Sequence, residues 1–158
     1  MTSEEFARRV EALRPTLYRV CRAQLSAEAD REDAIQEAVF RAWRKRKSLR
    51  DERCFNAWFI RILINACRDI QRQHRRVLPV EETPEPPPKD DARLAALRDA
   101  MDCLEERQRL CLVLHHIEGY SVKEVATMLN LGESAVKQRL LRGRRKLKEM
   151  LSEEVFGE

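Results

Sequence analysis

Residues 121–147, SVKEVATMLNLGESAVKQRLLRGRRKL, contain the pattern that decides the fold of this chain. Ser121 and Glu124 have the spacing of a capping box, which predicts the start of a short helix. Residues 130–132, Asn-Leu-Gly, are typical of a turn, and a second helix is expected over about residues 133–151. Two helices joined by a short turn of this kind predict a helix-turn-helix.

The second helix of this pair has two chemically different faces. Val136, Leu140 and Gly143 follow one another at helical spacing, so we expect their face to be buried. The other face carries hydroxyl, amide and cationic groups, which can contact base edges and phosphates of DNA. A solvated basic helix without a ligand is the alternative. The candidate DNA-binding residues here are Ser134, Lys137, Gln138, Arg139, Leu141, Arg142 and Arg144.

Outside this motif, composition favours helices and the charge is unevenly distributed. The chain has 158 residues, only 4 Gly, and a net charge of +4 from 31 Lys and Arg against 27 Asp and Glu. Residues 1–76 carry 18 basic and 11 acidic groups, whereas residues 77–91 carry 1 and 5, and residues 92–158 carry 12 and 11. The acidic middle stretch is also rich in proline, which predicts an extended linker. We therefore expect an all-α fold, with a helical bundle over 1–76 and a helix-turn-helix domain over 92–158.

Apolar residues at helical spacing predict three helices in the first domain. Pro15 should kink or split the first of them. Asp30 can cap the second, over about residues 31–46, and the third is expected over about residues 54–76. A polar loop, residues 47–53, joins the last two.

The third helix also has a polar stripe roughly opposite its apolar face. Its positive charge could hold a DNA backbone electrostatically, and for Asn65 a plain helix-surface amide is the alternative. The candidate residues are Arg61, Asn65, Arg68, Asp69 and Arg72.

Two long stretches together resemble a known family. Residues 30–76 resemble the second conserved domain of bacterial sigma factors of the extracytoplasmic-function group, and residues 104–147 resemble the fourth domain of the same group. The resemblance implies a dissociable specificity subunit of bacterial RNA polymerase that reads the −10 and −35 promoter elements. The matching positions in the first stretch are Asp33, Gln36-Glu37-Ala38, Arg41-Ala42-Trp43, Ala57-Trp58, Arg61-Ile62 and Asn65.

The resemblance also implies roles for particular residues. Leu49 and Asn65 occupy the positions that capture a flipped −10 base, although relatives often have an aromatic residue in place of Leu49. The fourth domain would dock on the β flap through apolar residues, for which Leu104, Leu110 and Leu114 are candidates, although their spacing fits core residues equally well. An anti-sigma factor would be a further partner. An ordinary solvated helix face is the alternative for the positions that match the family's contact with the polymerase β′ clamp, which are Asp33, Gln36, Glu37 and Arg41.

Other classes of function are weaker fits to the sequence. A stand-alone helix-turn-helix transcriptional regulator is the main alternative, since residues 121–140 are compatible with one. We find no paired-carboxylate metal site, glycine-rich phosphate loop or activated nucleophile, so we expect no enzyme activity, cofactor or small-molecule substrate. Cys111 and His115 share a helical face, but a metal site there would need further ligands, for which Cys103 is the only nearby candidate, and a buried cysteine beside a half-exposed histidine pair is the alternative. The absence of a membrane-length apolar run predicts a cytoplasmic protein with reduced cysteines.

Overall fold

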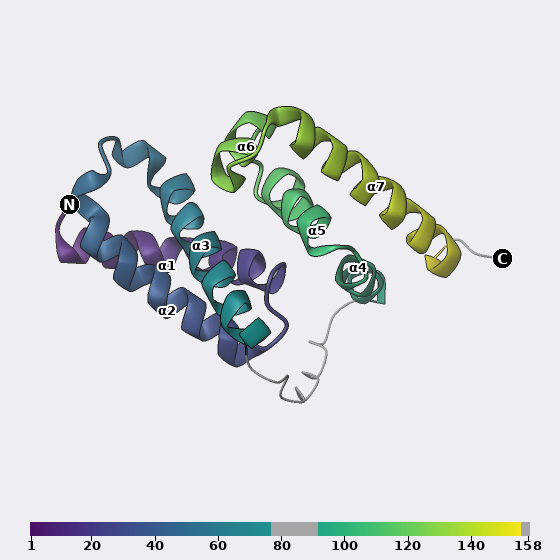
Figure 1. Cartoon of the computed structure of the whole chain (residues 1–158), viewed down its shortest axis with the longest axis horizontal. Helices are drawn as coiled ribbons and strands as arrows, with labels where there is room; N and C mark the ends of the chain where they lie inside the picture. The colour runs from purple at the N-terminus through teal and green to yellow at the C-terminus, as the bar shows by residue number, and fades with distance from the viewer. Residues whose placement is uncertain (77–91, 156–158) are drawn as a thin grey trace. The chain divides into compact units, whose positions relative to one another are not determined.

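The computed structural model describes residues 1–76 and 92–155, and every regular element in those two ranges is a helix (Figure 1). The prediction of an all-α fold is therefore confirmed. The chain divides into two compact units, Met1–Glu82 and Thr83–Glu158, and each has its own helices. The linker predicted over 77–91 lies outside the described residues.

Residues 1–76, the described part of the first unit, form a bundle of three long helices that pack pairwise against one another. They bury an apolar core in which Leu17, Phe59 and Leu63 are fully inaccessible to solvent. Two short 3-10 turns form the connection between the second and third helices (Figure 1). The elements are α1 (Ser3–Arg22), α2 (Glu28–Lys45), η1 (Arg46–Ser48), η2 (Glu52–Cys54) and α3 (Phe55–Arg76).

One expectation about the helices of this unit is wrong, and another is wrong in part. Pro15 does not split α1, which continues to Arg22 because its apolar face stays packed in the core on both sides of the proline. Asp30 does not cap α2, which begins three residues before the predicted start and lacks a side-chain cap at Ala27. Instead, Arg31 is buried and donates hydrogen bonds to backbone carbonyls of the α1–α2 connection.

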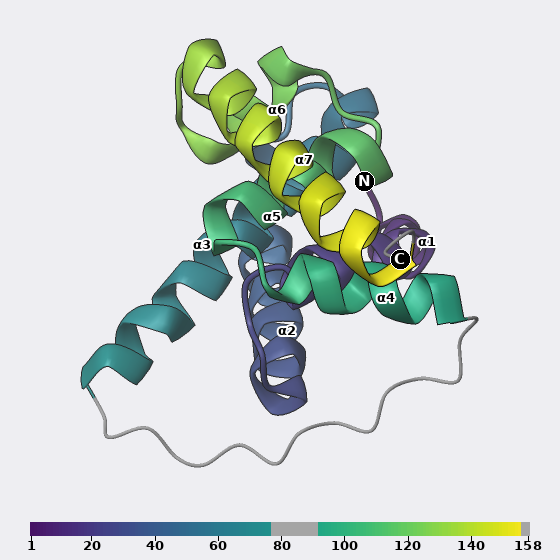
Figure 2. The same ribbon diagram turned by 90° about the vertical axis from the view of Figure 1, so that its right-hand side faces the viewer.

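Over its described residues, 92–155, the second unit contains four α-helices and one π-helical segment. The last helix, α7, packs against the other three α-helices. Figures 1 and 2 both show α7 as the longest element of the unit. The first of these helices, α4, ends at Asp102, so Leu104 lies beyond it. The elements are α4 (Ala92–Asp102), α5 (Glu106–Leu112), η3 (Val113–Ile117), α6 (Val122–Leu129) and α7 (Glu133–Val155).

All five cysteines are free thiols. Cys21 and Cys67 are buried in the first unit with their Sγ atoms 3.9 Å apart, and Cys111 is buried in the second unit. Among the described helices, none is long and apolar enough to cross a membrane.

Candidate nucleic-acid interface

The helix-turn-helix forms as the local sequence predicts. The Ser121 hydroxyl accepts from the Glu124 N–H at 3.1 Å, and the Glu124 carboxylate accepts from the Ser121 N–H at 3.1 Å, which completes the capping box. At the other end of α6 the chain turns at Asn130, whose φ of 56° is left-handed. Asparagine tolerates this conformation better than most residues, so Asn130 rather than Gly132 is the turning point.

The two faces of α7 separate as expected. Val136 and Leu140 are 0% and 2% exposed, so they anchor the helix in the core of the unit. Gly143 allows close approach to α5, because a Cβ at this position would lie 2.9 Å from Leu112 Cδ1. The opposite face is solvent-exposed at six of the seven candidate positions, which are Ser134, Lys137, Gln138, Leu141, Arg142 and Arg144.

Two candidate arginines of α7 are engaged within the unit. Arg139 is half-buried and lies beside the Cys111 thiol, whose pKa is raised by burial and partly lowered again by the charge and hydrogen bond of Arg139. Arg144 Nη1 lies 3.3 Å from His116 Nε2. Burial, His115 and Arg144 together lower the pKa of His116, which favours a neutral ring that can accept from Arg144.

The polar stripe of α3 lies opposite the buried Phe59 and Leu63. Its members differ in exposure: Arg61, Asn65 and Arg72 are exposed, whereas Arg68 and Asp69 are half-buried. The stripe therefore offers an amide and two cations to a ligand, with one carboxylate, that of Asp69, among them.

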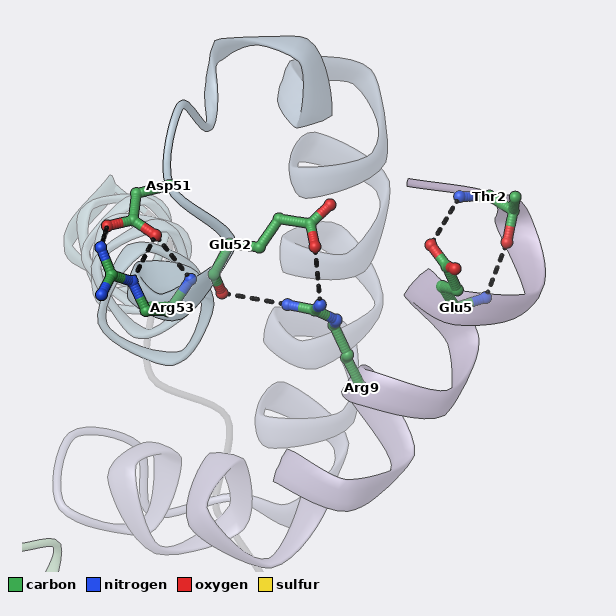
Figure 3. Close-up of polar contacts among 6 residues, drawn as sticks. All are labelled: Thr2, Glu5, Arg9, Asp51, Glu52 and Arg53. Carbon is green, nitrogen blue, oxygen red and sulfur yellow. Dashed lines mark hydrogen bonds and ion pairs between the residues drawn. The ribbon is translucent and has the colours of Figure 1, made fainter.

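Leu49 lies in the α2–α3 connection, where it follows η1 and is half-buried. This connection is tied to α1: Arg9 donates to the Glu52 carbonyl and pairs with its carboxylate, both at 3.0 Å (Figure 3). In the same segment Arg53 donates to the Asp51 carboxylate from its backbone and side chain (Figure 3). The segment that carries Leu49 thus has a defined shape rather than being only a polar loop.

Candidate residues on α2 share one exposed surface. Asp33, Gln36 and Glu37 are exposed, whereas Arg41 is half-buried. Gln36 also lines a groove of about 580 Å³ between α1 and α2. Helical spacing alone did not indicate this groove or its exposed Phe40, although Phe40 falls outside the stripe of buried Ala34, Ala38 and Ala42 and could have been found on that basis.

The three leucines considered as candidates for docking on the β flap do not form an exposed surface. Leu104, Leu110 and Leu114 are 4%, 4% and 0% exposed, so they belong to the core of the second unit. Helical periodicity marks apolar residues that face away from water, and it cannot distinguish a core from a partner surface. Among the side chains of this unit that the structure describes, the exposed large apolar residues are instead Leu94, Leu97, Ile117 and Leu141.

The Cys111–His115 pair also has no metal-site geometry. His115 Nδ1 lies 2.7 Å from the Tyr120 carbonyl oxygen, which occupies one ring nitrogen. Within the described ranges, no cluster of three or more His, Cys, Asp or Glu side chains could hold a metal ion.

The chain matches two family descriptions in order. Residues 9–77 match "Sigma-70 region 2" and residues 94–147 match "Sigma-70, region 4", which includes the helix-turn-helix. These two regions define a transcription initiation factor of the sigma-70 class.

Relatives that align with most of this chain show to which group within the sigma-70 class it belongs. The chain is 32% identical over 140 residues to the ECF RNA polymerase sigma factor SigM of Mycobacterium tuberculosis, covering 85% of this chain and 71% of the relative. It is 30% identical over 152 residues to the RNA polymerase sigma-E factor of Streptomyces coelicolor, covering 93% and 86%. The chain belongs to the extracytoplasmic-function (ECF) sigma factors, which bind RNA polymerase and direct it to promoters.

Solved structures agree with the fold. The sigma factor RpoE of Bartonella quintana, in complex with the anti-sigma factor NepR, has a TM-score of 0.79 at 22% identity, covering 94% of this chain and 98% of that chain. CnrH, in complex with the cytosolic domain of CnrY, has a TM-score of 0.71 at 29% identity, covering 96% and 90%.

Proposed function

We propose that the exposed face of α7 reads the −35 promoter element. The observation that carries this proposal is the division of α7 into a buried face and an exposed polar face directly after the helix-turn-helix turn. Lys137, Gln138 and Arg142 have the donors and acceptors that major-groove base edges require. Ser134 and Leu141 lie on the same face, whereas Arg139 and Arg144 suit phosphates at its border.

The first unit would bind the −10 element. Arg61 and Arg72 are exposed cations that can neutralise phosphates, and Asn65 is an exposed amide that can pair with a base edge. Leu49 is carried by the braced segment before α3, where an apolar side chain could pack against an unstacked base. This division assigns residues 1–76 to the −10 element, residues 92–158 to the −35 element, and residues 77–91 to the linker between them.

The exposed surface of α2 would contact the β′ clamp of the polymerase. Asp33, Gln36 and Glu37 support this because they are exposed and are not needed for the core. The neighbouring groove adds apolar contact area, with Tyr18 and Phe40 39% and 56% exposed. An interface that combines a polar surface with aromatic side chains is typical of protein partners.

An anti-sigma factor is a further proposed partner. CnrH, 29% identical to this chain, was solved with the cytosolic domain of CnrY, which makes regulation by a bound protein a reasonable inference here. Because polymerase and promoter DNA are cytoplasmic, the chain would act in the cytoplasm. It would catalyse no reaction itself, since the catalytic centre belongs to the polymerase.

Transcription from a genomic promoter library, with bacterial core polymerase and the purified chain, tests this proposal. We expect start sites that need both components and that share two sequence elements upstream. Arg142→Ala should change the preferred bases of the −35 element, and Asn65→Ala those of the −10 element. Tight, specific DNA binding without core polymerase, and no promoter-dependent initiation with it, would favour the stand-alone regulator.

A further inference from the structure

A row of four charged residues connects α2 to the polar stripe of α3. Arg41 Nε donates to the Glu37 carboxylate at 2.9 Å, and Arg41 Nη2 donates to Asp69 Oδ2 at 2.7 Å. The second oxygen of Asp69 lies 3.6 Å from Arg72 Nη1. One guanidinium therefore joins a carboxylate on the proposed polymerase surface to a carboxylate on the proposed DNA surface.

The Arg41 side chain is turned towards these carboxylates rather than towards solvent. It is 28% exposed, whereas Glu37, Asp69 and Arg72 are 49%, 43% and 69% exposed. The hydrogen bond to Asp69 is the main reason why the pKa of Arg41 is raised above its ordinary value. Two fixed partners leave this guanidinium poorly placed to bind a third group on another protein.

We propose that Arg41 is a positioning residue for DNA binding, which holds and neutralises the Asp69 carboxylate so that the α3 stripe presents positive charge to the −10 strand. The proposal rests on the DNA-binding role proposed for the stripe. It also separates Arg41 from the polymerase contacts Asp33, Gln36 and Glu37.

The physical consequence of losing Arg41 follows from charge. In Arg41→Gln, Asp69 would keep its negative charge without its closest cation, so it would repel phosphates and attract Arg72 more strongly. We expect DNA affinity to fall about fivefold, the scale of one solvent-exposed ionic interaction. Removing the negative charge of Asp69 itself should reverse the loss of DNA affinity. The double variant Arg41→Gln with Asp69→Asn should therefore bind DNA with wild-type affinity.

Two binding measurements on holoenzyme built from the full chain test this. The first is fluorescence anisotropy with a forked DNA of mixed sequence and a single-stranded arm, because the effect of charge does not depend on sequence. The second is the affinity of the labelled chain for core polymerase. Arg44→Gln is the matched control, since Arg44 is an exposed cation of α2 whose guanidinium lies over the Phe40 ring. It should leave DNA affinity unchanged.

The outcomes separate this inference from the wider proposal. Arg61→Gln removes a stripe cation that is remote from the Arg41 network, and if it does not weaken DNA binding, the −10 assignment of the stripe fails. If Arg61→Gln weakens binding but Asp69→Asn does not rescue Arg41→Gln, the positioning role fails. A loss of core-polymerase affinity in Arg41→Gln that Asp69→Asn leaves uncorrected would make Arg41 a polymerase contact. Asp69→Asn alone should bind DNA as tightly as wild type or slightly more tightly, and a clear loss would also overturn the inference.

Discussion

The two helices proposed to face DNA differ in how their charges are arranged. On α7, Lys137 and Arg142 are exposed on a face set by helical spacing within one short stretch of sequence. On α3, the charge of the stripe depends on Asp69, whose partner Arg41 lies 28 residues earlier on another helix. The first surface is therefore encoded locally, whereas the second requires the first unit to be folded.

The largest effect should come from disturbing the crossing of α7 and α5. Gly143→Ser would place a Cβ 2.9 Å from Leu112 Cδ1 and 3.4 Å from Gln108 Cβ, so we expect a loss of about 3 kcal/mol in unfolding free energy. Gly132→Ser is the matched control, because a Cβ there meets nothing within 4 Å and serine is favoured just before a helix. Chemical denaturation measures both, and equal stability of the two variants would contradict the role given to Gly143.

Removing a free cation from α7 should have the next largest effect. Arg142→Ala should cost about 2 kcal/mol of promoter affinity and relax selectivity at particular −35 bases, if Arg142 reads base edges. Lys148→Ala removes the same charge farther along α7 and should weaken all −35 sequences alike. Holoenzyme binding to a set of −35 variants measures this difference. If Arg142→Ala weakened binding to all −35 variants equally, Arg142 would be a phosphate contact. Its position on α7 would then act on DNA through charge alone, as the cations of the α3 stripe are proposed to do.

Much of the second unit could be predicted because its signals lie close together in sequence. The capping box of Ser121 and Glu124 forms with both hydrogen bonds, and Val136 and Leu140 are buried as their spacing indicates. Apolar spacing could not predict whether a residue is covered by the chain's own core or by another protein. Leu104, Leu110 and Leu114 were equally compatible with a core or a docking surface, and the fold puts them in the core.

In the first unit the missed features depend on contacts between distant residues. The start of α2 is determined by its connection to α1, where Arg31 bonds the Leu25 and Ser26 carbonyls, rather than by a cap at Asp30. Asp30 instead pairs with His74, near the end of α3. Neither pairing leaves a periodic trace in the sequence, so periodicity could find the polar stripe of α3 but not the network of Asp69 and Arg41.

The two units share one local device, a capping box, which allows a direct comparison. Ser121→Ala should cost about 1 kcal/mol, because α6 has eight residues and lies in the middle of its unit. Thr2→Ala removes the corresponding cap of α1, where Thr2 accepts from the Glu5 N–H at 3.2 Å (Figure 3). Because α1 can fray at this end, the loss of unfolding free energy in Thr2→Ala should be only a few tenths of the loss in Ser121→Ala. Thermal unfolding measures both, and a larger loss for Thr2→Ala would contradict this order.

The smallest effect concerns acid sensitivity at the edge of the α7 surface. The pKa of His116 is lowered by burial and by His115 and Arg144, so the unfolded chain takes up a proton at a higher pH than the folded chain does. The stabilisation from neutral His116 is therefore complete above a pH of roughly 6.5 and is lost as pH falls through the lowered pKa. His116→Gln keeps an acceptor for Arg144 but cannot titrate, so the melting temperature of this variant should fall less than that of wild type between pH 7.5 and pH 5. Arg144→Gln removes one of the cations that lower this pKa and should reduce the acid loss in the same direction. Identical slopes in all three proteins would contradict this prediction, because they would show that neither the titration of His116 nor its contact with Arg144 adds pH-dependent stability.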